Sequence, residues 1–254
     1  MKKTHIIVIP GNPGIVEYYD NFANSLKLNG YKVTVLNYDN FSDKPSEKLF
    51  SIKEELYEKK EQILKIIDPK DRNVLVGHSI GCWISLKLMS EIHFDLCVMI
   101  FPFLRKSFSF KQLGIGFFLN FKDAIIDFYN IVRSNKHSFL LLSRAINSFH
   151  MSHSSNRVTK DYFLNKDAAK RCLSLAKTEF ETLSFDFDIK SLKKFKDKLI
   201  FYYCKNDIWA PESDFKLISQ MGFLCSMLEG PKHDFCVRKD DVEIVSKKLI
   251  EDLK

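Results

Sequence analysis

VLVGHSIGCW, residues 74–83, is an apolar run that leads directly into the glycine-bounded pattern GHSIG. The apolar residues predict a buried strand over 73–78, and the residues after Ser79 have the spacing of a helix. A serine between a strand and a helix, with Gly77 and Gly81 two positions away on either side, is typical of a nucleophile elbow. The pattern therefore predicts that Ser79 is a nucleophile, and the alternative is a structural turn.

Strands alternate with helices toward both ends of the chain, which predicts an α/β fold with a mainly parallel sheet covered on both faces. The expected strands span 4–10, 31–38, 73–78, 95–101, 198–204 and 223–228. The expected helices span 49–67, 80–90, 211–221 and 242–253, and Tyr18, Tyr19, Phe22 and Leu26 mark a further helical face. This order places Ser79 at the carboxyl edge of the sheet.

Residues 102–195 interrupt this alternation and contain no clear strand. The segment predicts a mostly helical cap inserted into a single domain that spans residues 1–254. Residues 101–195 hold 16 Lys and Arg against 8 Asp and Glu, a net charge of +8, which suits an anionic surface or a solvated face. The apolar stretch 113–121 either packs inside the cap or dips into a lipid interface.

The composition excludes several classes of protein. Of the 254 residues, 45% are hydrophobic, so the chain is globular rather than disordered. No apolar run reaches 18 residues and no signal sequence is evident, which predicts a cytoplasmic protein without a membrane span. The six cysteines form no C-x-x-C pair, so neither a metal site nor a disulfide framework is expected. No glycine-rich cofactor loop and no nucleic-acid recognition motif accompanies the basic charge.

A nucleophilic serine needs a general base and an acid, which follow it in the order serine, acid, histidine in this topology. Among the seven histidines, only His233 follows the last predicted strand, so it is the candidate base. Asp207 lies three residues beyond Cys204, on the turn after the penultimate strand, and is the candidate acid. The alternatives are a solvated loop histidine and an aspartate that only caps an Asx turn.

An oxyanion hole requires two backbone N–H donors. One is expected from Ile80, the residue after the nucleophile, and the other from the loop PGNPG at 10–14. Pro13 has no N–H, which leaves Asn12 or one of the two glycines, and Asn12 is preferred. His78 completes the predicted elbow beside its two glycines.

The signatures IPGNPGIVEYY, GHSIGCW, NDIWAP and HDFC together resemble the lipid droplet-associated hydrolase family of the α/β-hydrolase superfamily. The resemblance implies a serine hydrolase with Ser79, Asp207 and His233 as its triad. It also implies a cytosolic protein that coats lipid droplets through its middle region. Weak hydrolysis of cholesterol esters is attributed to this family, so the resemblance implies a lipid ester as substrate.

The resulting hypothesis is a serine hydrolase of lipid esters that forms an acyl-enzyme on Ser79. One alternative is a thioesterase or acyltransferase that uses the same triad. Another is a droplet-surface protein with incidental activity, held by the Phe-rich basic segment 102–128. The expected location is the cytoplasm and the lipid droplet surface, with the face of the endoplasmic reticulum membrane as a further site.

Overall fold

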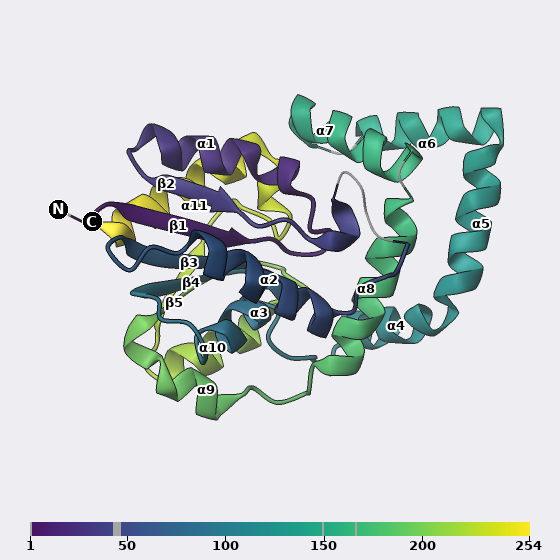
Figure 1. Cartoon of the computed structure of the whole chain (residues 1–254). Coiled ribbons are helices and arrows are strands. Elements are labelled where there is room, and N and C mark those ends of the chain that lie inside the picture. Colours follow the sequence, from purple (N-terminus) through teal and green to yellow (C-terminus); the bar gives the residue numbers. More distant parts are fainter. Residues whose placement is uncertain (1, 43–46, 149, 166) are drawn as a thin grey trace.

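A sheet of six parallel strands lies at the centre of the protein in the computed structural model (Figure 1). The structure describes all residues except 1, 43–46, 149 and 166. Within this described part the strands are β1 Thr4–Ile9, β2 Lys32–Val35, β3 Arg72–His78, β4 Leu96–Ile100, β5 Leu199–Cys204 and β6 Leu224–Leu228. They lie in the order β2-β1-β3-β4-β5-β6, and all neighbouring strands are parallel. The parallel sheet predicted from the alternating pattern is therefore confirmed.

The inner strands are buried on both faces, which explains their continuous apolar runs. Ile6 to Ile9 in β1 and Val74 to Val76 in β3 have no exposed surface. The register pairs Gly77 of β3 with Ile9 of β1 and with Met99 of β4. The carboxyl ends of these three strands consequently meet at one edge of the sheet.

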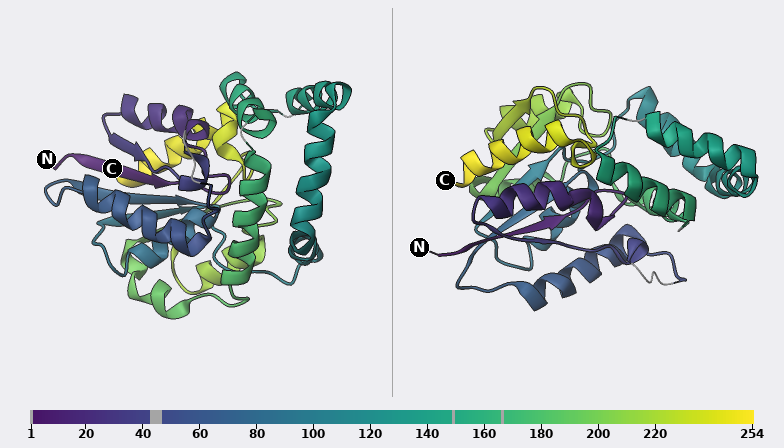
Figure 2. Two further views of the ribbon diagram at one scale, coloured as in Figure 1. Left: turned by 45° about the vertical axis from the view of Figure 1, so that its right-hand side comes forward. Right: turned by 90° about the horizontal axis from the view of Figure 1, so that it is seen from above.

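Helices cover both faces of the sheet (Figures 1 and 2). One face carries α1 Asp20–Leu28 and α11 Lys239–Leu253, which pack against each other. The other face carries α2 Ile52–Ile66, α3 Ile80–Leu88, α9 Ile189–Lys194 and α10 Glu212–Gln220. This arrangement gives the three layers expected of an α/β protein.

Two elements are shorter than the sequence pattern predicts. Helix α2 begins at Ile52 because Ser51 accepts a hydrogen bond from the Glu54 N–H and Glu54 bonds back to the Ser51 N–H, so Leu49 lies outside it. The edge strand β2 ends at Val35 instead of continuing to Tyr38.

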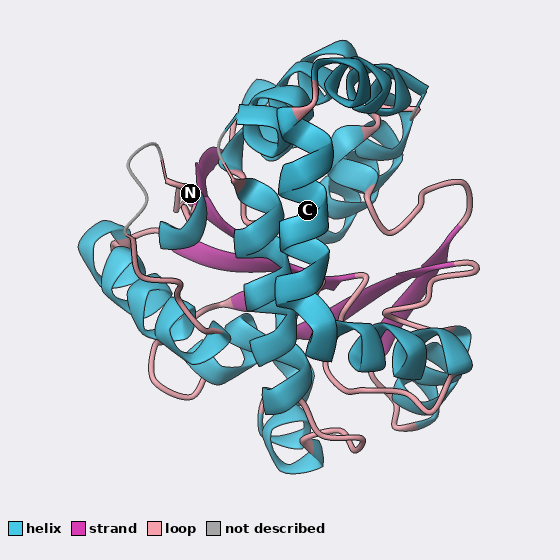
Figure 3. Ribbon diagram, turned by 90° about the vertical axis from the view of Figure 1, so that its right-hand side faces the viewer, coloured by secondary structure: helices cyan, strands magenta, loops and turns pink. Residues whose placement is uncertain are grey.

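The middle of the chain forms helices α4 Phe110–Phe118, α5 Lys122–Ser134, α6 Lys136–Ser148, α7 His153–Lys160 and α8 Ala168–Thr182. We call residues 110–182 the cap. The cap lies at one edge of the sheet, with α8 nearest the sheet and α5 farthest from it (Figures 1 and 2), and it faces the viewer in Figure 3. The Lys106 N–H donates to the Ser184 carbonyl at 2.7 Å, so the chain enters and leaves the cap at one place. The last helix of the predicted insertion, α9, instead packs against α3 beside the sheet.

Candidate active site

Ser79 lies between the end of β3 and the start of α3, in a strained backbone conformation. Its φ of 54° and ψ of −123° lie where side chains other than glycine are rare, which costs on the order of 1–3 kcal/mol. Three hydrogen bonds hold this conformation. The Ser79 N–H donates to the Ile100 carbonyl at 3.0 Å, and the Ser79 carbonyl accepts from the N–H groups of Cys82 and Phe103.

The two glycines of the GHSIG pattern allow the strand, the turn and the helix to pack this closely. A Cβ on Gly77 would lie 2.7 Å from the Cys82 Cα. A Cβ on Gly81 would lie 2.4 Å from the Ile9 carbonyl oxygen. Both distances are shorter than van der Waals contact allows, so neither position tolerates a side chain without movement of the backbone.

The three predicted triad residues come together at the carboxyl edge of the sheet. His233, in the loop between β6 and α11, places its Nε2 2.9 Å from Ser79 Oγ. Its Nδ1 lies 2.7 Å from the Oδ2 of Asp207, which follows β5. A carboxylate only accepts hydrogen bonds, so Nδ1 carries the proton and Nε2 is free to accept from the Ser79 hydroxyl.

Asp207 is buried and held in its ionised form. Burial raises the pKa of Asp207, but the hydrogen bond and charge of His233 and the N–H groups of Trp209 and Ala210 outweigh it, so the pKa lies below its usual value. Its Oδ1 accepts from Trp209 at 2.8 Å and from Ala210 at 3.2 Å. These bonds leave Oδ2 to orient the imidazole.

His78 forms two side-chain hydrogen bonds that its place in the elbow pattern does not predict. Its Nε2 lies 2.8 Å from the carbonyl oxygen of His233, which can only accept, so Nε2 carries the proton. Its Nδ1 therefore accepts from the Tyr19 hydroxyl at 2.6 Å. Burial, and then the nearby His233, lowers the pKa of His78 to about 3, so the ring is neutral. The Tyr19 oxygen in turn accepts from the Gly11 N–H at 2.9 Å.

The two predicted oxyanion residues lie in the two segments next to Ser79, the start of α3 and the loop after β1. Ile80 is the first residue of α3, where the N–H has no acceptor within the helix and the helix dipole favours negative charge. The loop after β1 passes so close that a Cβ on Gly11 would lie 3.0 Å from the Ser79 Cβ. The Gly11 N–H is already bonded to Tyr19, which favours Asn12 as the second donor. These two donor roles stay predictions.

Several neighbours of the triad were not predicted from the sequence. The indole of Trp209 and the ring of Phe101 lie 6.4 and 6.3 Å from the His233 imidazole, between ring centres. The Asn12 side chain donates to the carbonyl of Cys172 in α8 at 3.0 Å, and Glu179 of the same helix is buried near it. The cap helix α8 is therefore in direct contact with the loop that carries the predicted oxyanion donor.

Comparison with known proteins agrees with this architecture. Residues 2–236 match the family described as lipid-droplet associated hydrolase. The chain belongs to this family. It is 27% identical to a lipid droplet-associated hydrolase of Dictyostelium discoideum, over 85% of this chain and 76% of the relative. It is 26% identical to the lipid droplet-associated hydrolase of Gallus gallus, over 97% of this chain and 85% of the relative.

Solved structures share the fold at much lower identity. A putative lipase from Acinetobacter baumannii superposes with a TM-score of 0.70 at 14% identity, over 99% of this chain and 83% of the lipase. An esterase from Exiguobacterium antarcticum gives a TM-score of 0.69 at 13% identity, over 98% and 91% of the two chains. The predicted α/β-hydrolase fold and the predicted family are thus confirmed.

Proposed function

We propose that this α/β hydrolase cleaves carboxylic esters of lipids through an acyl-enzyme on Ser79. The observation that carries the proposal is the continuous hydrogen-bonded chain from Ser79 Oγ through His233 to Asp207, with distances of 2.9 and 2.7 Å. The strained backbone at Ser79 and the family relationship support the same assignment. A serine activated in this way attacks carbonyl carbon.

Acylation begins when Ser79 Oγ forms a bond to the ester carbonyl carbon and its proton passes to His233 Nε2. Asp207 stabilises the resulting imidazolium and keeps its orientation. The carbonyl oxygen takes up the negative charge between the N–H groups of Ile80 and Asn12. The bond to the alcohol oxygen then breaks, and His233 returns the proton to that oxygen, so the alcohol leaves.

Deacylation repeats the same steps with water. His233 takes a proton from a water molecule as the water oxygen attacks the acyl carbon. Collapse of this second intermediate breaks the bond to Ser79 Oγ, and His233 returns the proton to the serine. The products are one carboxylic acid and one alcohol for each ester and water consumed.

Labelling with a fluorophosphonate probe tests the nucleophile. We expect the wild-type protein to be labelled and Ser79→Ala not to be labelled, because the probe reacts only with an activated serine. Asp207→Asn should lower kcat on a soluble ester by about 10⁴-fold. Ser90→Ala, an exposed serine just beyond α3, is the matched control and should behave as wild type. Equal labelling of wild type and Ser79→Ala would contradict the proposal.

Thioester hydrolysis and acyl transfer share the first half of this mechanism. To distinguish these activities from ester hydrolysis, kcat/KM is measured on acyl-CoA, cholesteryl esters and p-nitrophenyl esters. Each substrate is tested with and without an alcohol that could accept the acyl group. Higher kcat/KM on the oxygen esters, with water as the acceptor, is the result that the proposal expects.

We further propose that the cap attaches the protein to the surface of lipid droplets. Within the described residues, most of the exposed large apolar side chains lie in or beside α4, α5 and α6. Phe110 is 95% exposed, and the exposed ring of Phe117 contacts those of Phe118 and Phe121. Exposed apolar patches of this kind are typical of interaction sites, and the family name points to a lipid surface. In the part of the chain that the structure describes, no helix is long and apolar enough to cross a membrane.

A further inference from the structure

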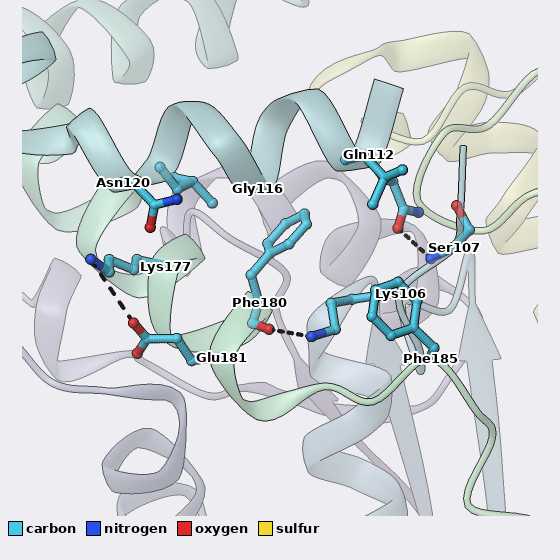
Figure 4. Close-up of a pocket in the computed structure, with 11 residues that line it drawn as sticks. Lys106, Ser107, Gln112, Gly116, Asn120, Lys177, Phe180, Glu181 and Phe185 are labelled. Carbon is cyan, nitrogen blue, oxygen red and sulfur yellow. Dashed lines mark hydrogen bonds and ion pairs between the residues drawn. The ribbon is translucent and has the colours of Figure 1, made fainter. Parts of the chain in front are cut away.

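A small pocket lies between α4 and α8, beside the segments through which the chain enters and leaves the cap (Figure 4). Its volume is about 290 Å³, and its lining includes Gln112, Leu113, Gly116, Leu119, Phe180 and Phe185. Figure 4 shows the Phe180 ring pointing from α8 toward α4 at Gly116. The volume lies near the lower end of the usual range for ligand pockets, which suits one narrow chain rather than a whole lipid.

An aromatic cluster connects this pocket with the catalytic residues. The Phe180 ring lies 5.8 Å from the ring of Phe103 and 6.1 Å from that of Trp209. Phe103 donates its N–H to the Ser79 carbonyl, and Trp209 contacts the His233 imidazole. The three aromatic rings thus pack against one another, with Phe103 and Trp209 beside the triad and Phe180 in the lining of the pocket.

The charged side chains at the rim of the pocket already have partners. Lys106 donates to the Phe180 carbonyl at 2.9 Å, and its ammonium also lies 4.8 Å from the centre of the Phe185 ring. Lys177 pairs with Glu181 at 4.0 Å. Figure 4 shows both pairs along the margin of the pocket. A free carboxylate or phosphate would have to displace these partners, whereas an uncharged hydrocarbon chain would not.

We propose that this pocket binds the hydrocarbon chain of the substrate's acyl group, and that Phe180 determines how long a chain can enter. The proposal rests on the ester hydrolysis proposed above. When the ester carbonyl lies at Ser79, the acyl chain runs along the partly buried Trp209 and reaches the pocket past Phe180. Each methylene that such a site removes from water strengthens binding, so longer chains gain more from the pocket than short ones.

Two glycines of α4 offer a matched pair of substitutions. A Cβ on Gly116 would lie 3.2 Å from the Phe180 Cδ1, so a leucine there would fill the pocket. A Cβ on Gly114 would meet no atom within 4 Å, so a leucine there would point into open space. Both changes replace a helical glycine with a good helix former, which makes their effects on the helix alike.

The experiment measures kcat/KM for p-nitrophenyl esters with acyl chains from two to sixteen carbons, so that only the acyl group varies. We expect Gly116→Leu to lower kcat/KM for the long chains by at least about 10-fold while the acetate changes less than about twofold. Gly114→Leu should keep the wild-type profile. Phe180→Ala should shift the preference toward longer chains, which supplies a second test if Gly116→Leu does not fold.

Identical profiles for the two leucine variants, together with an unchanged profile for Phe180→Ala, would overturn the proposal. That result would favour the cavity of about 560 Å³ between the loops 205–209 and 230–234 as the acyl site, because Gly114 and Gly116 do not line it. Fluorophosphonate labelling of every variant separates the two hypotheses. A labelled protein whose chain-length profile does not move refutes only the acyl pocket, whereas absence of Ser79-dependent labelling refutes the proposed hydrolysis itself.

Discussion

Glu179 is a buried carboxyl group in α8 that lies beside the predicted oxyanion loop. Burial raises the pKa of Glu179 to about 8, against the opposing effect of Asn12. Both the Glu179 Oε1 and the Asn12 Oδ1 are buried without a hydrogen-bond partner. A protonated Glu179 carries a hydroxyl that can donate a hydrogen bond, which a carboxylate cannot do. Glu179 of the cap therefore lies beside the candidate oxyanion loop with a pKa well above the usual value of a carboxyl group.

The raised pKa of Glu179 predicts how stability depends on pH. Below about pH 4.5 the group is protonated in both the folded and the unfolded chain. Between 4.5 and 8 only the folded chain keeps the proton, so the free energy of unfolding falls as the pH rises through this window and levels off above it. Urea unfolding from pH 4 to pH 9 measures this decline, and Glu179→Gln should flatten it.

Glu181→Gln is the matched control for this prediction, because Glu181 is an exposed carboxyl two residues further along α8. It should retain the wild-type decline. If Glu179→Gln and wild type show the same pH dependence, Glu179 is not the group that titrates in this range.

At the scale of elements, the neutral His78 ring links the loop after β1 to the loop that carries His233. The proposed mechanism requires a fixed distance between these two loops. Through Tyr19 it reaches the Gly11 N–H in the loop after β1, and through its Nε2 it reaches the His233 carbonyl. The candidate oxyanion loop and the candidate base are thus joined by one chain of hydrogen bonds.

Tyr19→Phe breaks this link and leaves the Gly11 N–H and His78 Nδ1 without their buried partner. We expect kcat on a soluble ester to fall by about 10-fold with little change in KM, and the free energy of unfolding to fall by about 1–3 kcal/mol. Steady-state kinetics and urea unfolding measure the two effects.

The neighbouring Tyr18 provides the control, because its hydroxyl bonds to Thr159 in α7 at 2.7 Å instead of to the elbow. Tyr18→Phe should lose similar stability while kcat stays within about twofold of wild type. Equal losses of kcat in the two variants would show that the hydroxyl of Tyr19 acts through general stability alone.

The alternation of elements could be predicted from the sequence because the inner strands are buried on both faces and read as continuous apolar runs. The prediction was less accurate at the edge, where β2 is only half buried and has one neighbouring strand. The chain leaves β2 after Val35, and Tyr38 then packs over Gly14 and donates to the Pro10 carbonyl at 2.8 Å. These contacts depend on tertiary packing, which a local pattern does not contain.

The meeting of Ser79, Asp207 and His233 could be predicted because each follows a strand whose carboxyl end reaches the same edge. The roles of Tyr19 and Glu179 could not be predicted in this way. Tyr19 lies 59 residues from His78 in the sequence, and its spacing indicated only a helical face. The aromatic pair that follows PGNPG was a signal of the family, but nothing in it specified a hydrogen bond to the elbow.

At the scale of the whole molecule, most of the exposed phenylalanines lie on the cap, whereas the candidate triad lies at the carboxyl edge of the sheet. Replacement of Phe117, Phe118 and Phe121 by serine should therefore reduce flotation with phospholipid-coated triolein droplets by at least about 10-fold, because about 0.8 kcal/mol is lost for each CH₂ group no longer buried. The same variant should keep wild-type kcat on a soluble acetate ester.

Two controls accompany the droplet measurement. Leu28→Ser removes an apolar side chain that is 88% exposed on α1, outside the cap, and should still float. Ser79→Ala should float as well. Undiminished flotation of the triple variant would rule out these phenylalanines as the attachment site.

The net charge of +8 over residues 101–195 makes a separate prediction. Flotation of the wild-type protein should weaken at high salt on anionic droplets but not on neutral ones.

The hydrogen bond between Lys106 and Ser184 has an evolutionary consequence. Because the chain departs and returns at a single point, the intervening residues form a module that recombination can exchange between genes without altering the register of any strand. One catalytic sheet can thereby inherit different caps, each with its own surface and its own chain-length preference. Such an exchange must still preserve a contact like that between Asn12 and the Cys172 carbonyl, because it joins the cap to the candidate oxyanion loop.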